Sequence, residues 1–136
     1  MELDEALDVV REQPRAVLAT WRSDGSPQMS PVLVSVGDGG RLVMSTRETA
    51  FKTKNLARDP RASLCVLPDT FFGRWVQLDC SAELVHLPDA MDLLITYYRN
   101  LSGEHPDWEE YRTAMRSEQR LAVLFTIERA GPDRAG

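Results

Sequence analysis

The feature that most constrains the fold is a series of short strand-like runs separated by tight-turn signals. Residues 15–21 form a nearly continuous apolar run, and Ser23-Asp24-Gly25-Ser26 follows it. Asp-Gly supplies the positive φ angles that a tight hairpin turn requires, so the next run, residues 28–36, is expected to pair with the first. Residues 37–40 give a second turn signal, and residues 41–46 a third strand. The spacing predicts a meander of three hairpin-connected strands.

Three more strands are predicted along the chain, at residues 62–67, 74–86 and 121–128. Helical spacing of apolar residues predicts helices at 3–12, after Pro88 and at about 107–117, and a short helix inside 44–61. Pro31 lies within the second strand and marks an edge, a bulge or a backbone that faces something other than a strand. This order indicates a mainly β fold, a six-stranded antiparallel β-barrel, closed or partly closed, with peripheral helices. We expect one domain at residues 1–129 and a loose tail at 130–136.

Composition excludes several classes of function. The net charge of −5 argues against non-specific nucleic-acid binding, and no apolar run is long enough to cross a membrane. The acidic N-terminus lacks the layout of a signal peptide, so we expect a cytoplasmic protein. Two cysteines and two distant histidines form no metal-binding pattern, and the cysteines are interpreted as buried, reduced thiols. We assign no metal ligand.

A basic segment, residues 44–61, stands out in this acidic chain. It carries five cations and two acids, and it holds the only two lysines of the sequence, Lys52 and Lys54. Hydroxyl side chains followed by a helix N-terminus favour an anion such as phosphate. Lys52 and Lys54 point to different faces of a helix, so we expect Lys52 to be the phosphate ligand and Lys54 to point outward or towards a partner chain. The alternative is a solvated helix with ordinary surface charge.

The order of these segments resembles a known family. Residues 15–20, Asp24-Gly25 and Pro27-Gln28-Met29-Ser30-Pro31-Val32 resemble the opening hairpin of the pyridoxamine-phosphate-oxidase-like split barrels, the FMN-binding split-barrel family. Residues 44–47 followed by 52–61 resemble the strand-to-helix phosphate site of that family. The similarity is greatest to the small actinobacterial branch that uses the deazaflavin coenzyme F-420. It covers residues 3 to about 129.

This resemblance implies a homodimeric split barrel with two cofactor sites at the subunit interface. The backbone at Pro31 and Val32 would lie along the cofactor ring, and the phosphate side would be lined by Ser45, Thr46, Arg47, Lys52 and Asn55, with Lys54 nearby. Trp75 and the loop carrying Phe71 and Phe72 would close the site, from the same or the other chain. For Trp75 the alternative is a place in the core. The chain is too short for the C-terminal substrate-binding segments of a true pyridoxamine phosphate oxidase, which argues against pyridoxal phosphate synthesis.

The implied activity is that of an F-420-dependent oxidoreductase that transfers a hydride between the reduced cofactor and an electron-poor small organic substrate. The cofactor supplies the reactive carbon and the protein supplies orientation and a dry site. We therefore assign no catalytic residue. The alternatives are an oxidase or flavin reductase of the same fold that uses flavin mononucleotide (FMN), and a non-catalytic ligand-binding protein. Both cofactors end in phosphate, so the basic segment does not distinguish them.

Overall fold

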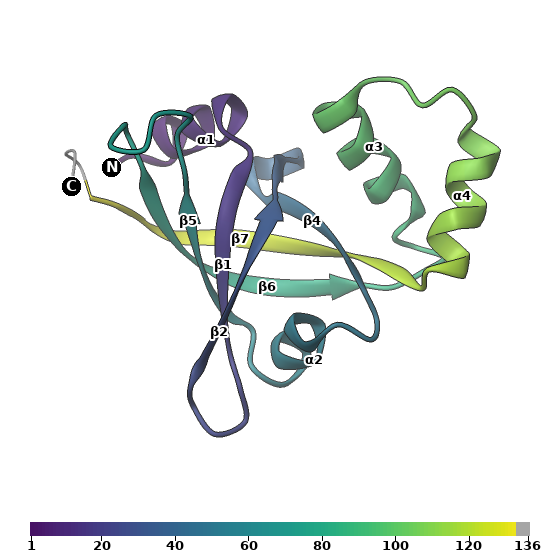
Figure 1. The fold of residues 1–136 in the computed structure, drawn as a ribbon, viewed down its shortest axis with the longest axis horizontal. Coiled ribbons are helices and arrows are strands. Elements are labelled where there is room, and N and C mark those ends of the chain that lie inside the picture. Colours follow the sequence, from purple (N-terminus) through teal and green to yellow (C-terminus); the bar gives the residue numbers. More distant parts are fainter. Residues whose placement is uncertain (133–136) are drawn as a thin grey trace.

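Strands dominate the computed structural model, which describes residues 1–132 (Figure 1). The strands are β1 (Arg15–Trp21), β2 (Pro27–Leu33), β3 (Ser35–Val36), β4 (Leu42–Arg47), β5 (Arg61–Val66), β6 (Val76–Val85) and β7 (Arg120–Gly131). The helices are α1 (Leu3–Glu12), α2 (Phe51–Arg58), α3 (Met91–Ser102) and α4 (Trp108–Ser117), with a short 3₁₀ turn at Asp38–Gly40. Within this part of the chain, no helix is long and apolar enough to cross a membrane.

All seven strands belong to one curled antiparallel sheet, in the order β2-β1-β5-β6-β7-β4-β3. The mainly β, antiparallel prediction is thus confirmed, with seven strands in place of six. The two edge strands, β2 and β3, are joined in the chain by Val34 alone, so the sheet is curled into a half-barrel.

The predicted meander is wrong because the expected second strand divides at Val34. Val34 is fully buried, and its N–H donates to the carbonyl of Pro14 at 2.9 Å instead of to a strand partner. Beyond this bend, Ser35 and Val36 pair with Val43 and Leu42 of β4. β2 therefore pairs only with β1 and is an edge strand, which is one of the positions that Pro31 indicated.

The first hairpin has the predicted turn. Gly25 adopts a φ of +86°, and the Asp24 carboxylate accepts hydrogen bonds from the N–H and the hydroxyl of Ser26. Asp24 and Gly25 therefore have the turn roles that the sequence predicts.

At the start of β7 the sheet is buried on both faces, which explains the unbroken apolar run there. Its odd-numbered residues Leu121, Val123 and Phe125 face the barrel interior, which α1 closes at one end. Ala122 and Leu124 face outward and are covered by α3 and α4. In Figure 1, α3 and α4 lie together beside the sheet, away from α1.

The segment boundaries differ little from those predicted. The expected strands at 62–67, 74–86 and 121–128 correspond to β5, β6 and β7, and the helix at 3–12 matches α1. β7 extends further than expected, because Ala130 and Gly131 still pair with Leu78 and Gln77 of β6. The expected loose tail thus begins with two residues of strand, and residues 133–136 lie outside the described part of the chain.

Candidate functional site

The basic segment folds as the end of β4, a short turn and α2. The N–H of Ala50 and the hydroxyl of Thr53 both donate to the carbonyl of Arg47, at 3.2 and 2.6 Å. The Thr53 hydroxyl also lies 3.2 Å from that of Thr46, and both threonines are buried. Thr46, predicted to line the phosphate side, thus fastens α2 to β4 and has its hydroxyl turned into the protein.

Asn55 fastens the other side of α2 to the first hairpin. Its amide nitrogen donates to Thr20 Oγ1 at 3.1 Å and to Gln28 Oε1 at 2.9 Å. Its amide oxygen accepts from Arg58 at 3.2 Å, and only 6 % of the residue is exposed. Both polar atoms of the side chain are therefore engaged within the protein. α2 fills the space between the β1–β2 hairpin and β4 at the lower end of the view in Figure 1.

Three of the five cations in the segment are engaged by protein oxygens. Arg47 pairs with Glu118 at 3.4 Å, Arg58 donates to the carbonyl of Trp21 at 2.6 Å, and Arg61 forms a forked ion pair with Asp59. Within residues 1–132, Lys52 and Lys54 have neither an ion pair nor a hydrogen bond from their side chains.

Lys52 and Lys54 differ in their surroundings. Lys52 is half-buried in the first turn of α2, next to the end of β4. Lys54 is exposed, and its Nζ lies 5.8 Å from the centre of the Phe51 ring. Lys52 is thus the cation of this segment that is both partly enclosed and free to bind an anion.

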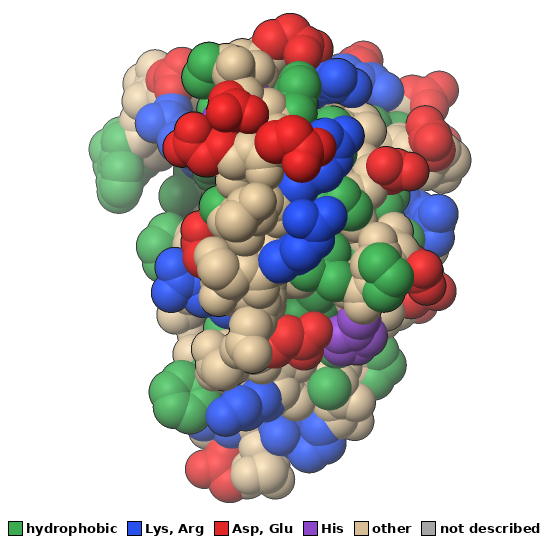
Figure 2. Space-filling view, turned by 90° about the vertical axis from the view of Figure 1, so that its right-hand side faces the viewer, with side chains coloured by type: hydrophobic (Ala, Val, Ile, Leu, Met, Phe, Trp, Pro, Cys, Tyr) green, Lys and Arg blue, Asp and Glu red, His purple; other side chains and the backbone are tan. Residues whose placement is uncertain are grey.

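Lys and Arg side chains elsewhere on the side that carries α3 and α4 are interspersed with acidic and polar ones (Figure 2).

Pro31 and Val32 lie further along β2. They border a largely apolar depression of about 420 Å³, together with Arg15, Ala16, Val17, Leu33 and Leu67. Val32 is four residues from Gln28, which contacts Asn55. At about 3.3 Å per residue, this separation is about 13 Å. A cofactor with its ring at Pro31 and its phosphate at Lys52 therefore has to extend along β2.

Ser45 faces away from α2. It lines a cavity of about 410 Å³ between β4, α3 and α4, bordered by Tyr97, Tyr98, His105, Glu110, Tyr111, Ala114, Met115, Glu118 and Arg120. The hydroxyl of Tyr97 donates to the carbonyl of Leu33 at 3.1 Å, so this cavity adjoins the end of β2. Burial raises the pKa of Tyr97, and it raises that of Tyr111 to about 12, which keeps both phenols protonated.

Trp75 lies at the other end of the strands from α2. It immediately precedes β6, half-buried, and lines a depression with Gln77, Asp79, Arg129, Ala130, Gly131 and Pro132. Val76 pairs with Val66, and Val66 with Ala16, whereas α2 contacts β1 at Thr20. Within one chain, the structure does not bring Trp75 together with Lys52.

The loop expected to close the site is the most exposed apolar part of the chain. Phe71 and Phe72 are 86 % and 83 % exposed, with ring centres 4.8 Å apart.

Both cysteines are free thiols, as expected, and Cys80 is buried while Cys65 is half-buried. Burial raises the pKa of Cys65, and burial together with the nearby Asp79 and Glu128 raises that of Cys80 to about 12. Neither thiol has the low pKa of a nucleophile at neutral pH.

Sequence reasoning missed the polar residues that position α2 and those that line the cavity beside Ser45. Thr20, Gln28 and Thr53 lie within the segments that carry the resemblance, but only their contacts with α2 and β4 reveal their role. Tyr97 and Tyr111 come from different helices. A helical-wheel comparison of α3 and α4 could have indicated a shared tyrosine-lined face.

The family model for pyridoxamine 5'-phosphate oxidase matches residues 3–131. The chain belongs to this family. The resemblance to the pyridoxamine-phosphate-oxidase-like split barrels is thereby confirmed, and the family includes oxidoreductases that bind flavin-type cofactors.

Solved structures share the fold. A conserved hypothetical protein from Mycobacterium tuberculosis is 27 % identical, with a TM-score of 0.78, and the match covers 96 % of this chain and 82 % of that one. An F-420 reductase is 21 % identical, with a TM-score of 0.67 and 91 % and 94 % coverage. The heme storage protein HutZ from Vibrio cholerae is 19 % identical, with a TM-score of 0.74 and 100 % and 98 % coverage. At these last two identities, the likeness shows the fold alone.

Proposed function

We propose that this family member is a cytoplasmic, homodimeric oxidoreductase that binds coenzyme F-420 and transfers a hydride between the reduced cofactor and an electron-poor small organic substrate. The observation that carries the proposal is Lys52, a half-buried cation at the first turn of α2 without an acidic partner among residues 1–132. The resemblance of residues 44–47 and 52–61 to the F-420-using branch supports F-420 over FMN, and an F-420 reductase shares the fold.

Lys52 binds the phosphate in this proposal, and the residues around it hold α2 in place. Thr46, Thr53 and Asn55 fix the helix between β4 and the β1–β2 hairpin, so the ammonium group is carried on a rigid element. A rigid site loses less conformational entropy on binding than a flexible loop. Lys54 is exposed and free to contact the cofactor tail or the partner chain.

The edge of β2 receives the ring. Because β2 pairs only with β1, every second residue has its backbone N–H and C=O directed away from the sheet. Pro31 has no N–H, so carbonyls dominate at this point of the edge. When bound, the deazaflavin supplies a carbon that donates or accepts a hydride. The chain orients this ring and keeps water from its apolar side.

A second copy of the chain completes the site. Met29 and Leu33 on β2 are 67 % and 45 % exposed, and Pro31 lies on the same face between them. An exposed edge strand with apolar side chains is a surface that soluble proteins normally cover. Trp75, Phe71 and Phe72, which lie far from α2 in their own chain, reach the site from the partner in this arrangement.

The test is a fluorescence titration of F-420 with the wild type, Lys52→Ala and the matched control Lys54→Ala. Loss of a charge-assisted hydrogen bond, worth about 1.5–3 kcal/mol, predicts about ten- to a hundredfold weaker binding by Lys52→Ala. Lys54→Ala is expected to lose much less. The difference in F-420 affinity between the wild type and Lys52→Ala is expected to become smaller at high salt, because salt screens the attraction between the ammonium group and the phosphate. Equal dissociation constants for these two proteins would refute the phosphate assignment.

FMN binding and a non-catalytic role are the alternatives, and two further measurements separate them. Titration with FMN under the same conditions decides which cofactor is bound. Tight, stoichiometric binding of FMN together with weak binding of F-420 would mean that the protein is an FMN-dependent flavoenzyme. Multiple-turnover assays of reduced F-420 with electron-poor alkenes decide between an enzyme and a binding protein. Tight F-420 binding without turnover of any acceptor favours the binding protein.

A further inference from the structure

The cavity beside Ser45, which we call the tyrosine cavity, has an excess of positive charge at one end. Arg47 and Arg120 are direct cross-strand partners on β4 and β7. Like charges in such positions destabilise a strand pair, because the two side chains start about 5 Å apart. Both guanidinium groups pair with the same atom, Oε1 of Glu118, at 3.4 and 3.1 Å. Neither arginine has another acidic partner among residues 1–132, so two positive charges share one negative charge.

Arg120 is the arginine that lines the cavity, and its side chain is only 26 % exposed. A partly enclosed charge is screened less by water and salt than a surface charge. Its contacts with Glu118 involve Nε and one terminal nitrogen. A guanidinium has five N–H groups, so several remain for a second anion. Such an anion can bind while the pair with Glu118 stays intact.

Ser45 adds a hydroxyl at the same end of the cavity. It precedes Arg47 by two residues, so both side chains leave the same face of β4. Ser45 is half-buried, and its hydroxyl has no hydrogen-bond partner among residues 1–132. A hydroxyl and a guanidinium on neighbouring strands suit an anion with oxygen atoms, such as a carboxylate.

The other walls of the cavity are largely aromatic. The rings of Tyr98, His105 and Tyr111 pack against one another, with ring centres 5.1 to 5.6 Å apart. The hydroxyls of Tyr97 and Tyr111 already donate to backbone carbonyls of β2 and α3, at 3.1 and 2.8 Å. What these side chains offer a ligand is therefore chiefly their rings. Aromatic rings attract one another in edge-to-face or offset arrangements, so this wall favours an aromatic ligand.

Glu110 determines the direction in which an anionic ligand lies. It also lines the cavity and has no ion pair within residues 1–132. It is eight residues before Glu118 in the sequence, which is about 12 Å along a helix. A carboxylate at Arg120 is therefore far from Glu110, whereas the reverse orientation would bring two negative charges together.

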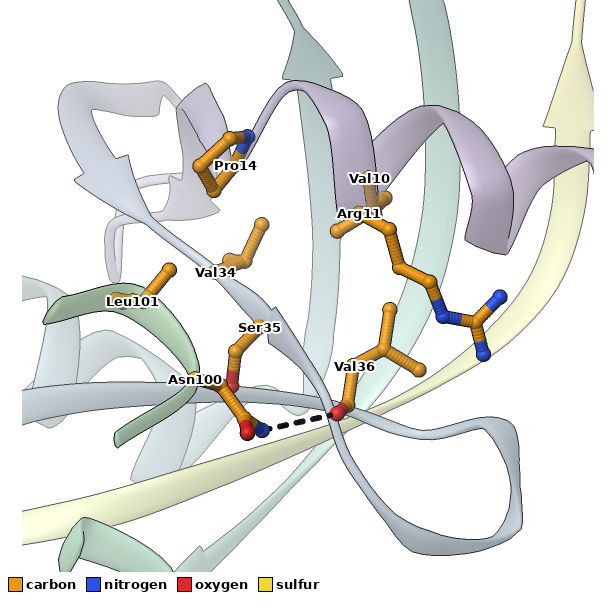
Figure 3. Close-up of a pocket in the computed structure, with 8 residues that line it drawn as sticks. All are labelled: Val10, Arg11, Pro14, Val34, Ser35, Val36, Asn100 and Leu101. Atoms are coloured by element: carbon orange, nitrogen blue, oxygen red, sulfur yellow. Dashed lines mark hydrogen bonds between the residues drawn. The ribbon is translucent and has the colours of Figure 1, made fainter. Parts of the chain in front are cut away.

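A second cavity, of about 480 Å³ between α1, β3 and the C-terminal end of α3, lacks this combination (Figure 3). Its one ionisable lining residue, Arg11, pairs with Asp8 at 2.9 Å, and Figure 3 shows the guanidinium directed away from Asn100. The charge of Arg11 is thus balanced, and none of the described residues that line this cavity is aromatic. The second cavity therefore serves as an internal reference in the experiment below.

We propose that the tyrosine cavity binds a small aromatic carboxylate, with the carboxylate held by Arg120 and Ser45 and the ring against Tyr98 and Tyr111. The cavity volume of about 410 Å³ is within the range of small-molecule sites. Because Ser45 faces away from α2, this site is separate from the phosphate site proposed at Lys52. It does not depend on which cofactor the protein binds.

The test uses 2-naphthoate, its uncharged counterpart 2-naphthalenemethanol, and acetate, which has the carboxylate without the rings. Each is titrated at neutral pH into ¹⁵N-labelled, cofactor-free protein while ¹H–¹⁵N correlation spectra are recorded. 2-Naphthoate is expected to cause saturable shifts in the amides of residues 45–47, 97–98 and 120, and none at residues 10–11 beside the second cavity. It should bind about tenfold more tightly than either of the other two molecules. Absence of saturable shifts at residues 45–47 and 120, or equal affinity for the alcohol, overturns the proposal without any variant.

Three charge variants locate the carboxylate. Arg120→Gln keeps a polar side chain, and we expect about tenfold weaker binding of 2-naphthoate, the loss of a charge-assisted hydrogen bond at a partly exposed site. Arg116→Gln changes an exposed arginine of α4 outside the lining and should bind like the wild type. Lys52→Ala should also bind 2-naphthoate like the wild type. Unchanged affinity in Arg120→Gln, or an equal loss in Lys52→Ala, overturns the proposal.

Ser45→Ala tests the hydroxyl and keeps both arginines. We expect about two- to tenfold weaker binding of 2-naphthoate, the loss of one hydrogen bond. Urea unfolding of each variant checks that the fold is retained, and Ser45→Ala takes the place of Arg120→Gln if that variant does not fold. Unchanged affinity in a folded Ser45→Ala overturns the assignment of this hydroxyl.

Discussion

Replacement of Asn55 by alanine is expected to destabilise the fold strongly, because its side chain ties α2 to the first hairpin. It makes three hydrogen bonds, at 2.9, 3.1 and 3.2 Å, and Thr20, one partner, is 1 % exposed. Three bonds at a net of about 1 kcal/mol each, plus about 1 kcal/mol for the stranded threonine hydroxyl, exceed the roughly 0.6 kcal/mol that alanine gains as a helix former. The free energy of unfolding should fall by about 2–4 kcal/mol.

The assay is urea unfolding followed by tryptophan fluorescence, at one fixed protein concentration so that any dimer contributes equally. For a chain of 136 residues, the same loss corresponds to a melting temperature lower by about 7–14 °C. Lys54→Ala, on the exposed face of the same helix, is the control and should stay within about 0.5 kcal/mol of the wild type. If Asn55→Ala is as stable as this control and only cofactor binding is lost, Asn55 is a ligand contact and the tethering role is wrong.

Three further outcomes are expected. Asp107→Ala removes the carboxylate that caps α4, where it accepts from two backbone N–H groups at 3.1 and 3.2 Å, and should lower stability by about 1 kcal/mol in urea unfolding. The contribution of Cys80 and Tyr111 to stability should be constant below about pH 8.5 and should be lost between about pH 9 and 12, because the unfolded chain releases these protons before the folded protein, in which both pKa values are about 12. Equal unfolding midpoints at pH 8 and pH 11 would contradict this. Met29→Lys places a charge on the exposed face of β2 and should shift the proposed dimer towards monomer in sedimentation, whereas a wild type that is already monomeric at micromolar concentration contradicts the proposed interface.

The fold could be predicted from local signals wherever those signals were unambiguous. Alternating or continuous apolar runs located the strand-forming segments, although the predicted strand at 28–36 divides into β2 and β3, and Asp24-Gly25 located the first hairpin. The pairing after Val34 could not be predicted, because nothing local to residues 28–36 shows that the N–H of Val34 bonds to Pro14. That hydrogen bond depends on where the chain after α1 lies in the folded protein, which is a feature of the tertiary structure.

The residues of the candidate site could likewise be predicted only in part. Charge and helical spacing singled out Lys52, and its surroundings in the structure support that choice. The resemblance placed Ser45 with Thr46 on the phosphate side, although neighbouring strand residues face opposite sides of a sheet. Ser45 therefore lines the tyrosine cavity while Thr46 holds α2. Trp75 was grouped with the site only through the resemblance, and its distance from α2 within one chain depends on strand register.

The position of β7 in the sheet has a consequence for how the chain reaches its native state. β7 lies between β6 and β4, and β4 pairs with residues about seventy-eight positions later in the sequence. During synthesis, β2-β1-β5-β6 and the β3–β4 hairpin can each form, but they remain two separate sheets with an open edge apiece until the last strand leaves the ribosome. Pairing over such a sequence separation is slow, and open edges associate with other chains. The nascent protein is therefore most prone to aggregate just before its final strand is made.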